Sequence, residues 1–496
     1  MYVIGLDIGT TNTKAVVFDT EGNVIAQHQQ QYTLTIPRPD YAEQNPRMLL
    51  NAAVHAIQQV VRESKQSNFI GVGISAAMHS LLLIDEQHRP LTEVITWADN
   101  RSAEQATLIR QQFGLHLYER TGTPIHPMAP VSKLLWYKQN QPALFKRTAK
   151  FVSFKDYMLF QWFGRYVTDY SIASASGLFN LKSLDWDAKI LDWLGIRKEQ
   201  LPIAVPTTYP LRGLNPHWAR QLGLHPDTPF IIGASDGCLA NLGIGAIEPD
   251  ELAITIGTSG AIRAVVGQPL IDPKMRSFCY ALTDKHWVIG GPTNNGGLVL
   301  QWFRDQLATG VSLEQLTREA ASVPPGSDGL LCLPYLTGER APIWNADARG
   351  TFFGVMLHHQ RAHFTRAIME GVIFCLYRIG QALQELTGDF HTLRASGGFA
   401  QSPLWCQILA DVFGIEVNVP ESHQSSSWGA AILVLLAMGK IERIDAFRDR
   451  LGEKQRYLPN QNRHQTYQQL HPLFEELSAA LTGPFGKIAA MQREQK

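Results

Sequence analysis

The sequence predicts an α/β fold built from two similar halves. Short apolar strands, a helix and another strand follow one another within the first 75 residues, which favours a layered α/β domain. A strand–turn–strand unit also opens the chain and recurs after about half of its length. Such an internal repeat is typical of a protein with two related domains. The boundary falls near 245–250, which predicts domains over residues 1–246 and 247–496.

The first half opens on two apolar runs joined by a polar turn. Residues 2–6 and 14–18 flank the turn Gly9-Thr10-Thr11-Asn12-Thr13, which predicts an antiparallel hairpin. The next expected elements are a helix over 46–64 and strands over 69–75 and 229–234. Residues 120–215 carry many prolines and aromatic residues, and we interpret them as insertions around a core rather than as a separate domain.

The second half repeats the opening pattern. A strand over 251–256, a Gly-Thr-Ser-Gly turn at 257–260 and a strand over 261–266 reproduce the first hairpin. Apolar residues at helical spacing then predict helices over 298–307, 363–386, 404–413 and 428–438.

The composition excludes several classes of protein. Of the 496 residues, 44 are Lys or Arg and 44 are Asp or Glu, so bulk charge does not favour binding to nucleic acid or to an anionic membrane. No apolar run approaches the length of a membrane span, and the N-terminus does not read as a signal peptide. The five cysteines include no CxxC pair, which argues against a zinc ribbon or a disulfide framework. We therefore expect a cytoplasmic protein with reduced thiols.

The first turn has the residue types of an anion site. Its glycine allows close backbone approach, and backbone N–H groups with the hydroxyls of Thr10 and Thr11 offer donors to phosphate oxygens. Lys14 adds a cation. Asp7, at the end of the preceding strand, is placed to hold Mg²⁺, which takes one or two carboxylates together with water and phosphates. Taken alone, the segment also fits an ordinary hairpin turn.

The second turn, with Thr258 near its centre, strengthens the phosphate interpretation. Two such turns in matching halves are much less expected by chance than one. One would hold the β- and γ-phosphate region of a nucleotide and the other the transferred phosphoryl group.

Two further segments carry candidate chemistry. The glycine pair in 397–402 lies between a strand and a helix, where adenine or ribose can approach the backbone; a plain turn with Ser402 as N-cap is the alternative. Asp236 follows the strand over 229–234, and a carboxylate there can accept the proton of a substrate hydroxyl during phosphoryl transfer. An ordinary Asp-Gly turn is its alternative.

A third segment suits a polyhydroxylated ligand. Trp97-Ala98-Asp99-Asn100-Arg101, together with 75–80, offers an aromatic ring and several hydrogen-bonding groups. His79 alone is more typical of a structural histidine than of a metal ligand, because no second His or Cys stands at ligand spacing.

These motifs, in this order, resemble those of the FGGY family of carbohydrate kinases over nearly the whole chain. Residues 5–19 resemble the family's first phosphate motif, 255–261 its second and 397–402 its adenosine motif. The segment 128–136 is similar to the family's first signature, and 350–355 with 363–370 to its second.

The resemblance implies two ribonuclease-H-like, actin-type ATPase domains with an interdomain cleft. It implies that the domain over 1–246 carries the sugar side and the first phosphate loop, and that 247–496 carries the nucleotide side. It also implies that Asp236 is the catalytic base and that Asp7 helps to hold Mg²⁺. The positions that it assigns to ATP are Thr10, Thr11, Asn12, Lys14, Thr258, Gly297, Gln301, Gly398 and Ser402.

Within the family, the substrate segments point to a sugar acid. Met78-His79 and Met128 replace the Arg-Glu pair and the Tyr of glycerol kinases, and Met-His is shared with xylulokinases and gluconokinases. Residues 97–101, 122–128, 169–175 and 233–237 look most like gluconokinases. The implied reaction is phosphorylation of D-gluconate at O6 to give 6-phosphogluconate. The implied substrate residues are Met78, His79, Trp97, Asp99, Arg101, Met128 and Asp236.

Alternatives remain open at this stage. A xylulokinase-like pentulose kinase is the nearest. A non-catalytic actin-like ATP-binding protein or a sugar-binding regulator would not need Asp236 as a base. Arg101 and Lys155 are candidates for pairing with a substrate carboxylate. The expected partners are ATP and a small sugar acid or sugar, without nucleic acid or membrane, and a homodimer is left open.

Overall fold

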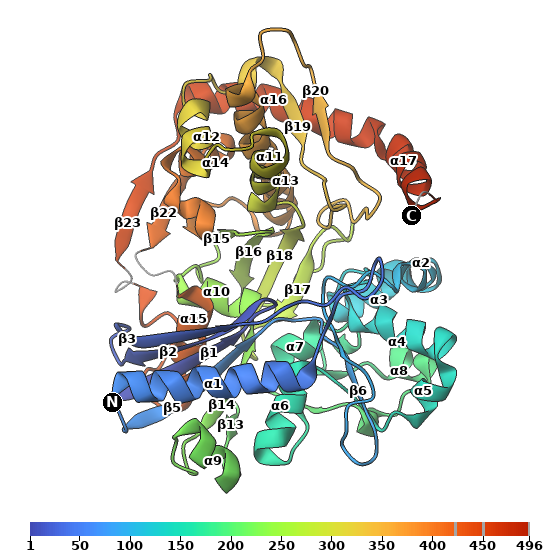
Figure 1. Cartoon of the computed structure of the whole chain (residues 1–496), viewed down its shortest axis with the longest axis vertical. Helices are drawn as coiled ribbons and strands as arrows, with labels where there is room; N and C mark the ends of the chain where they lie inside the picture. The colour runs from blue at the N-terminus through green and yellow to red at the C-terminus, as the bar shows by residue number, and fades with distance from the viewer. Residues whose placement is uncertain (421–423, 449–451, 495–496) are drawn as a thin grey trace. The chain divides into compact units, whose positions relative to one another are not determined.

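The computed structural model describes residues 1–420, 424–448 and 452–494, and its elements are labelled in Figure 1. The chain divides into two compact units. Unit 1 consists of Met1–Ile247, Val266–Val288 and Gln424–Asp449, and unit 2 of Glu248–Val265, Ile289–His423 and Arg450–Lys496. Unit 1 therefore takes two segments from the second half of the chain. No helix in the described residues is long and apolar enough to cross a bilayer.

Unit 1 contains a six-stranded mixed sheet in the order β13-β14-β5-β1-β2-β3. The strands are β1 (Tyr2–Ile8), β2 (Asn12–Asp19), β3 (Val24–Gln31), β5 (Phe69–Ala76), β13 (Pro210–Leu211) and β14 (Phe230–Ser235). β1 pairs antiparallel with β2, and Asp7 lies opposite Lys14. The predicted hairpin is therefore confirmed. β1, β5 and β14 run parallel, so their carboxyl ends meet at one edge of the sheet.

Different helices cover the two faces of this sheet. One face packs on α1 (Pro46–Ser64), whose bounds are those predicted from the sequence. The core between them contains Ile4, Leu6, Ile8, Leu49, Ala53 and Ile57. Gly5 and Gly73 point to the other face, where a Cβ atom would overlap a backbone carbonyl of α15 (Ser425–Ala437). Figure 1 shows α1 and α15 on opposite sides of strands β1–β3.

Glycine contacts also fix α15 against α10 (Asp236–Gly243), the helix that begins at the proposed base. A Cβ atom at Gly243 would overlap the carbonyl of Ser425, and one at Gly429 would overlap the carbonyl of Leu239. The two helix backbones are in direct contact as a result. The position of Asp236 therefore depends on this close packing.

We expect Gly243→Ala to lower the free energy of unfolding by about 1–3 kcal/mol, because overpacking forces the two helices apart. Urea unfolding checks this. The matched control is Gly486→Ala in α17 (Thr482–Glu494), where an added methyl group meets open space. Equal loss of stability in both variants would contradict the packing argument.

The region interpreted as insertions lies within unit 1 and packs around a second hydrophobic cluster. Leu83, Ile109, Leu134, Ile190 and Leu194 belong to this cluster. The remaining helices of this unit are α2 (Ala103–Gln112), α3 (Gly114–Thr121), α4 (Pro130–Asn140), α5 (Pro142–Arg147), α6 (Phe154–Phe163), α7 (Tyr170–Ser174), α8 (Ala188–Leu194) and α9 (Pro216–Leu222). Its short strands include β4 (Glu43–Gln44), β6 (Leu82–Ile84), β7 (Val94–Ile95), β8 (Lys150–Val152), β9 (Val167–Asp169) and β12 (Ile203–Val205).

Unit 2 repeats the strand connectivity of unit 1. Its sheet contains, in spatial order, β18 (Trp287–Thr293), β16 (Gly260–Val266), β15 (Glu251–Ile256), β21 (Thr392–Ser396), β22 (Glu416–Pro420) and β23 (Glu453–Tyr457). β15 pairs antiparallel with β16 and parallel with β21, as β1 pairs with β2 and β5. The internal repeat seen in the sequence is therefore a repeat of topology.

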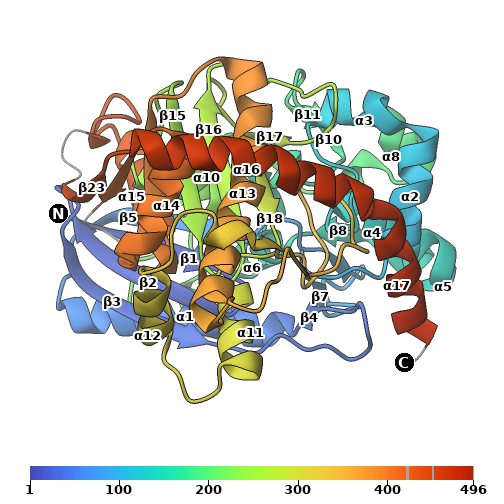
Figure 2. The same cartoon turned by 90° about the horizontal axis from the view of Figure 1, so that it is seen from above.

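The predicted helices of unit 2 are confirmed to within two residues at each end. They are α11 (Gly297–Leu307), α13 (Arg361–Thr387) and α14 (Pro403–Phe413). The rings of Tyr467 and Phe474 in α16 (Gln461–Ala480) pack on Phe374 in α13, and Figure 2 shows α16 lying across α13 and α14. The helix predicted over 428–438 is α15, which packs in unit 1 rather than in unit 2.

Candidate active site

Three adjacent parallel strands of unit 1 bring several predicted residues to one sheet edge. Asp7 near the end of β1 lies beside Ser75 of β5, and Ala76 of β5 lies beside Ser235 of β14. Met78 and His79 follow β5, and Asp236 follows β14. Ligands of open α/β sheets bind outside the carboxyl ends of such strands. This edge is therefore the candidate acceptor site.

Asp236 is the first residue of α10. Its Oδ1 atom accepts a hydrogen bond from the N–H of Gly237 at 2.7 Å. Ser235 caps the helix, and its backbone N–H donates to Ser171 Oγ at 3.2 Å. The Ser426 hydroxyl donates to the Asp236 carbonyl at 3.3 Å. These contacts hold the residue in place at the start of α10. A carboxylate held in this way is suited to accept a proton from a substrate hydroxyl.

Asp7 has the environment of a cation ligand. Ser75 Oγ donates to its Oδ1 atom at 2.6 Å, and in the described part of the chain no other group donates to this carboxylate. Removal from solvent raises the pKa of Asp7 above its ordinary value, against the opposing effects of the Ser75 hydrogen bond and the Lys14 charge. A divalent cation bound there would favour the ionised form.

The residues present fit a magnesium ion better than a metal held by protein alone. Among the described residues, no group of three or more His, Cys, Asp or Glu side chains is arranged to hold a metal. Mg²⁺ usually keeps several waters and binds one or two carboxylates together with substrate phosphates. Asp7 beside the first phosphate turn supplies such a carboxylate.

The first phosphate turn is braced from outside the hairpin. The Gly9 N–H donates to the Asn12 carbonyl at 2.9 Å and closes the turn. The Tyr32 hydroxyl donates to the Gly9 carbonyl at 2.6 Å, and Gln44 Nε2 donates to the Thr10 carbonyl at 2.6 Å. Thr11 at the tip is exposed. With its carbonyls held by side chains, the turn can present its remaining donors to an anion.

Lys14 lies on β2 opposite Asp7, and its Nζ donates to Gln424 Oε1 at 3.1 Å. Gln424 precedes α15, so this cation is held between the first hairpin and that helix within unit 1. Its assignment to an ATP phosphate remains a prediction.

The turn after β5 is held in an unusual conformation. His79 has φ = 68°, in the left-handed region that favours glycine, and its Nδ1 lies 2.8 Å from the Ala175 carbonyl oxygen. The buried Lys133 Nζ donates to the carbonyls of His79 and Thr96, at 2.6 and 2.8 Å. One side chain therefore ties together two of the predicted substrate segments. Met128, in the loop before α4, is buried.

Lys133 predicts a pH-dependent stability. Burial lowers its pKa from 10.5 to about 7, with Asp99 opposing and Arg101 reinforcing this effect. Between pH 7 and 10 the unfolded chain binds a proton that the folded chain does not, so the contribution of Lys133 to stability rises with pH.

We therefore expect the unfolding free energy of wild type, relative to that of Lys133→Met, to rise by roughly 1 kcal/mol per pH unit from pH 7.5 to 9.5. Urea titrations at several pH values measure it. The control is Lys138→Met on the same helix, which removes a hydrogen bond from an exposed lysine to the Trp193 carbonyl. Parallel pH dependences for wild type and Lys133→Met would contradict the expectation.

Arg101 and Lys155 are engaged by carboxylates of the protein itself. The Arg101 side chain is 3% exposed, donates to Asp99 and Glu43 at 2.7 and 2.5 Å, and stacks on Tyr41 at 3.7 Å. Lys155 lies 2.5 Å from Asp169, and both are buried. These contacts do not favour either cation as the partner of a substrate carboxylate. Asp99 also accepts the Ala42 N–H at 2.7 Å, and its assignment to the substrate remains a prediction.

In unit 2 the second phosphate turn is clamped by the start of α11. The N–H groups of Gly297 and Leu298 donate to the carbonyls of Gly257 and Thr258, at 2.7 and 3.2 Å. A Cβ atom at Gly296 would lie 2.6 Å from the Ser259 carbonyl oxygen. The first N–H groups of α11 therefore hold the second turn in place. Gln301 is exposed on the same helix.

The predicted adenosine segment lies at the same sheet edge as the second turn. Thr255 of β15 is paired with Ser396 of β21, and their hydroxyl oxygens are 2.9 Å apart. Gly397 has φ = 95°, and a Cβ atom there would lie 2.5 Å from the Ile256 carbonyl oxygen. Gly398 faces open space. Ser402 Oγ accepts the Trp405 N–H at 3.4 Å, so Ser402 serves as the N-cap of α14.

Several supporting residues were missed by the sequence analysis. Buried Glu339 accepts hydrogen bonds from Thr293 Oγ1 at 2.6 Å and the Asn294 N–H at 2.8 Å, and it holds the loop that leads into α11. Burial raises its pKa above the ordinary value. Tyr32 and Gln44 were missed as well. Their partners are distant in sequence, and spacing carries no signal for such contacts. Lys133 lies within the segment 128–136, and the resemblance of this segment to a family signature is the signal that could have identified the residue.

The fold and the two turns together define the class of protein. Two units repeat one strand connectivity, each places a glycine-containing turn between its first two strands, and unit 1 adds two carboxylates at the same edge. This repeated connectivity is the ribonuclease-H-like, actin-type architecture, and the two turns and carboxylates placed on it indicate an ATP-dependent phosphotransferase.

Family models for the FGGY family of carbohydrate kinases match the chain, the N-terminal domain over residues 2–243 and the C-terminal domain over 252–438. The chain belongs to this family. It is 47% identical to the gluconokinase of Bacillus subtilis, over 99% of this chain and 98% of that protein. Two Lactobacillus acidophilus crystal structures, described as a gluconate kinase and as a ligand-bound xylulose kinase, each superpose with a TM-score of 0.95 at 37% identity, covering 98% of this chain and 99% of theirs.

Proposed function

We propose that this protein transfers the γ-phosphoryl group of ATP to O6 of D-gluconate and releases 6-phosphogluconate and ADP. The observation that carries the proposal is the 47% identity to a gluconokinase over nearly the whole of both chains. The substrate segments that looked most like gluconokinases in the sequence support the same acceptor.

In the proposed reaction the O6 hydroxyl attacks the γ-phosphorus as the bond to the β–γ bridging oxygen breaks. Asp236 accepts the hydroxyl proton, and ADP leaves with the bridging oxygen. The donors of the first turn, with Thr10, Thr11 and Asn12, and Thr258 of the second turn stabilise the charge on the phosphate oxygens. Unit 1 contributes the acceptor residues and unit 2 the nucleotide residues Gly297, Gln301, Gly398 and Ser402.

Mg²⁺ belongs to the same proposal. Bound to the phosphates, it would neutralise charge on the nucleotide. Asp7 would hold it, directly or through water, and the Ser75 hydrogen bond fixes the orientation of that carboxylate. The five cysteines are buried free thiols, which supports the proposed location in a reducing cytoplasm.

Xylulose is the second candidate acceptor, because one of the two similar crystal structures is described as a xylulose kinase. Steady-state kinetics with gluconate, xylulose and glycerol, each coupled to ADP release, separate the candidates. We expect kcat/KM for gluconate to exceed that for xylulose by at least about 100-fold, since discrimination rests on hydrogen bonds that xylulose cannot reproduce. A higher kcat/KM for xylulose than for gluconate would show that xylulose is the acceptor.

A further inference from the structure

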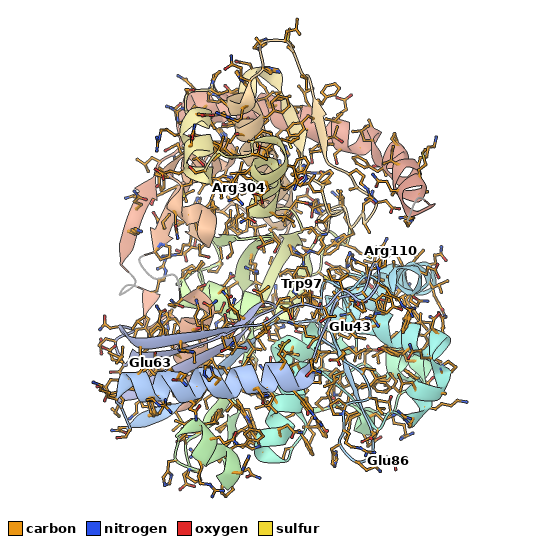
Figure 3. All side chains as sticks on the ribbon, viewed as in Figure 1. Glu43, Glu63, Glu86, Trp97, Arg110 and Arg304 are labelled. Carbon is orange, nitrogen blue, oxygen red and sulfur yellow. The ribbon has the colours of Figure 1, made fainter. Side chains whose placement is uncertain are left out.

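Trp97 donates its indole N–H to the hydroxyl oxygen of Thr10, and the two atoms are 2.7 Å apart. Both side chains are partly buried in unit 1, and the residues are 87 positions apart in sequence. Figure 3 labels Trp97 in the segment that follows β7. The contact joins the predicted sugar segment to the first phosphate turn.

The direction of this hydrogen bond has a chemical consequence. An indole N–H can only donate, so the Thr10 oxygen must accept. The hydrogen of the Thr10 hydroxyl is then left to donate to another acceptor. Because Gln44 also holds the Thr10 carbonyl, at 2.6 Å, both the backbone and the side chain of this residue are oriented by groups outside the turn.

Trp97 is itself held by neighbours on both sides. The Thr96 carbonyl accepts a hydrogen bond from Lys133, and the Thr96 N–H donates to the Ala42 carbonyl at 3.0 Å. Two residues later, Asp99 accepts the Ala42 N–H and the Arg101 guanidinium. The Trp97 backbone is thus fixed to the segment that also contains Gln44.

We propose that Trp97 is a positioning residue that aims the Thr10 hydroxyl at a phosphoryl oxygen of the nucleotide. The proposal rests on the proposed function and deepens it. The indole N–H of Trp97 serves the first phosphate turn. Its ring is the part of the side chain that the sequence predicts to contact the sugar.

Trp97→Phe separates the two roles, because phenylalanine keeps an aromatic ring and lacks the N–H. We expect kcat to fall about 10-fold, the effect of losing one hydrogen bond that matters for the transition state, with KM for gluconate changed less than 3-fold. Thr10→Val should cause a similar fall in kcat. The kcat of the double variant should be about that of the slower single variant, because both substitutions remove the same interaction.

Trp186→Phe is the matched control. It also removes an indole N–H, which donates to the Pro202 carbonyl at 2.9 Å in another part of unit 1. We expect its kcat to stay within 2-fold of wild type. Thermal unfolding of each variant checks that the fold is intact, and Thr10→Val at the partly exposed turn provides the test if Trp97→Phe does not fold.

Three results would each overturn the proposal. They are a kcat for Trp97→Phe within 2-fold of wild type, a rise in KM for gluconate alone, and effects of the two substitutions that multiply in the double variant.

Failure of the proposed function gives a different result. If wild type does not phosphorylate gluconate, the orientation of the Thr10 hydroxyl is tested instead by calorimetry with Mg·AMP-PNP. Trp97→Phe should then weaken AMP-PNP binding about 5-fold and leave adenosine binding unchanged, and equal affinity for AMP-PNP in both proteins would overturn the inference.

Discussion

Replacing Asp236 by asparagine should lower kcat for gluconate phosphorylation by about 10²–10⁴-fold while ATP binding is retained, because asparagine cannot accept the proton of the attacking hydroxyl. The substitution keeps the size of the side chain and leaves an oxygen to accept the Gly237 N–H. The hydrogen bond from the Ser235 N–H to Ser171 and that from Ser426 to the Asp236 carbonyl do not involve the carboxylate. We therefore expect the fold around α10 to persist.

The measurement is steady-state turnover together with calorimetric ATP affinity and thermal unfolding. Asp227→Asn is the matched control, since it makes the same chemical change at an 88%-exposed side chain in the loop before β14. Turnover of Asp236→Asn within about 10-fold of wild type would remove Asp236 from the role of base.

Asp7→Asn should be the second most damaging change, with a fall in kcat of about 10²–10³-fold and a higher Mg²⁺ concentration needed for half-maximal rate. Loss of a charged group that stabilises the phosphate transition state through a cation has an effect of this size. Ser75→Ala, which removes only the hydrogen bond to Asp7, should have a milder effect of about 10-fold or less.

The stability of Asp7→Asn distinguishes a functional loss from unfolding. Burial raises the pKa of Asp7, so the folded protein binds a proton more tightly than the unfolded chain does. Its contribution to stability therefore falls as pH rises from about 4 through that raised pKa. Above it, the ligand-free variant should be at least as stable as wild type. A lower melting temperature of ligand-free Asp7→Asn at pH 8 would contradict this account of the site.

The elements close to each phosphate turn could be predicted because their signals are local. The helix over 46–64 was predicted at its observed bounds, and Glu251–Ile256 was predicted in full. The repeat of the Gly-Thr turn identified the repeat of strand connectivity. Periodicity and turn chemistry suffice here because each element buries one face in its own neighbourhood.

The long-range contacts of the site could not be predicted from the sequence. Arg101 was expected as a substrate cation because its charge is visible in the sequence, whereas its partner Glu43 is 58 positions away. Figure 3 labels Glu43, which accepts a hydrogen bond from the Arg101 side chain, and Trp97, which begins the segment that contains Arg101. In the same way α15 completes unit 1 from the far end of the chain. Nothing in local spacing reports which side chains a distant helix or loop will meet.

Phosphoryl transfer from ATP to O6 of gluconate leaves a specific mark on the product, a phosphate bound at C6. Two-dimensional ¹H–³¹P NMR of the reaction of wild-type protein with gluconate, ATP and Mg²⁺ identifies the phosphorylated position. We expect one product whose phosphorus couples to the C6 methylene protons, formed in equal amount with ADP. ADP release without a phosphorylated sugar acid, or phosphate at another position, would contradict it.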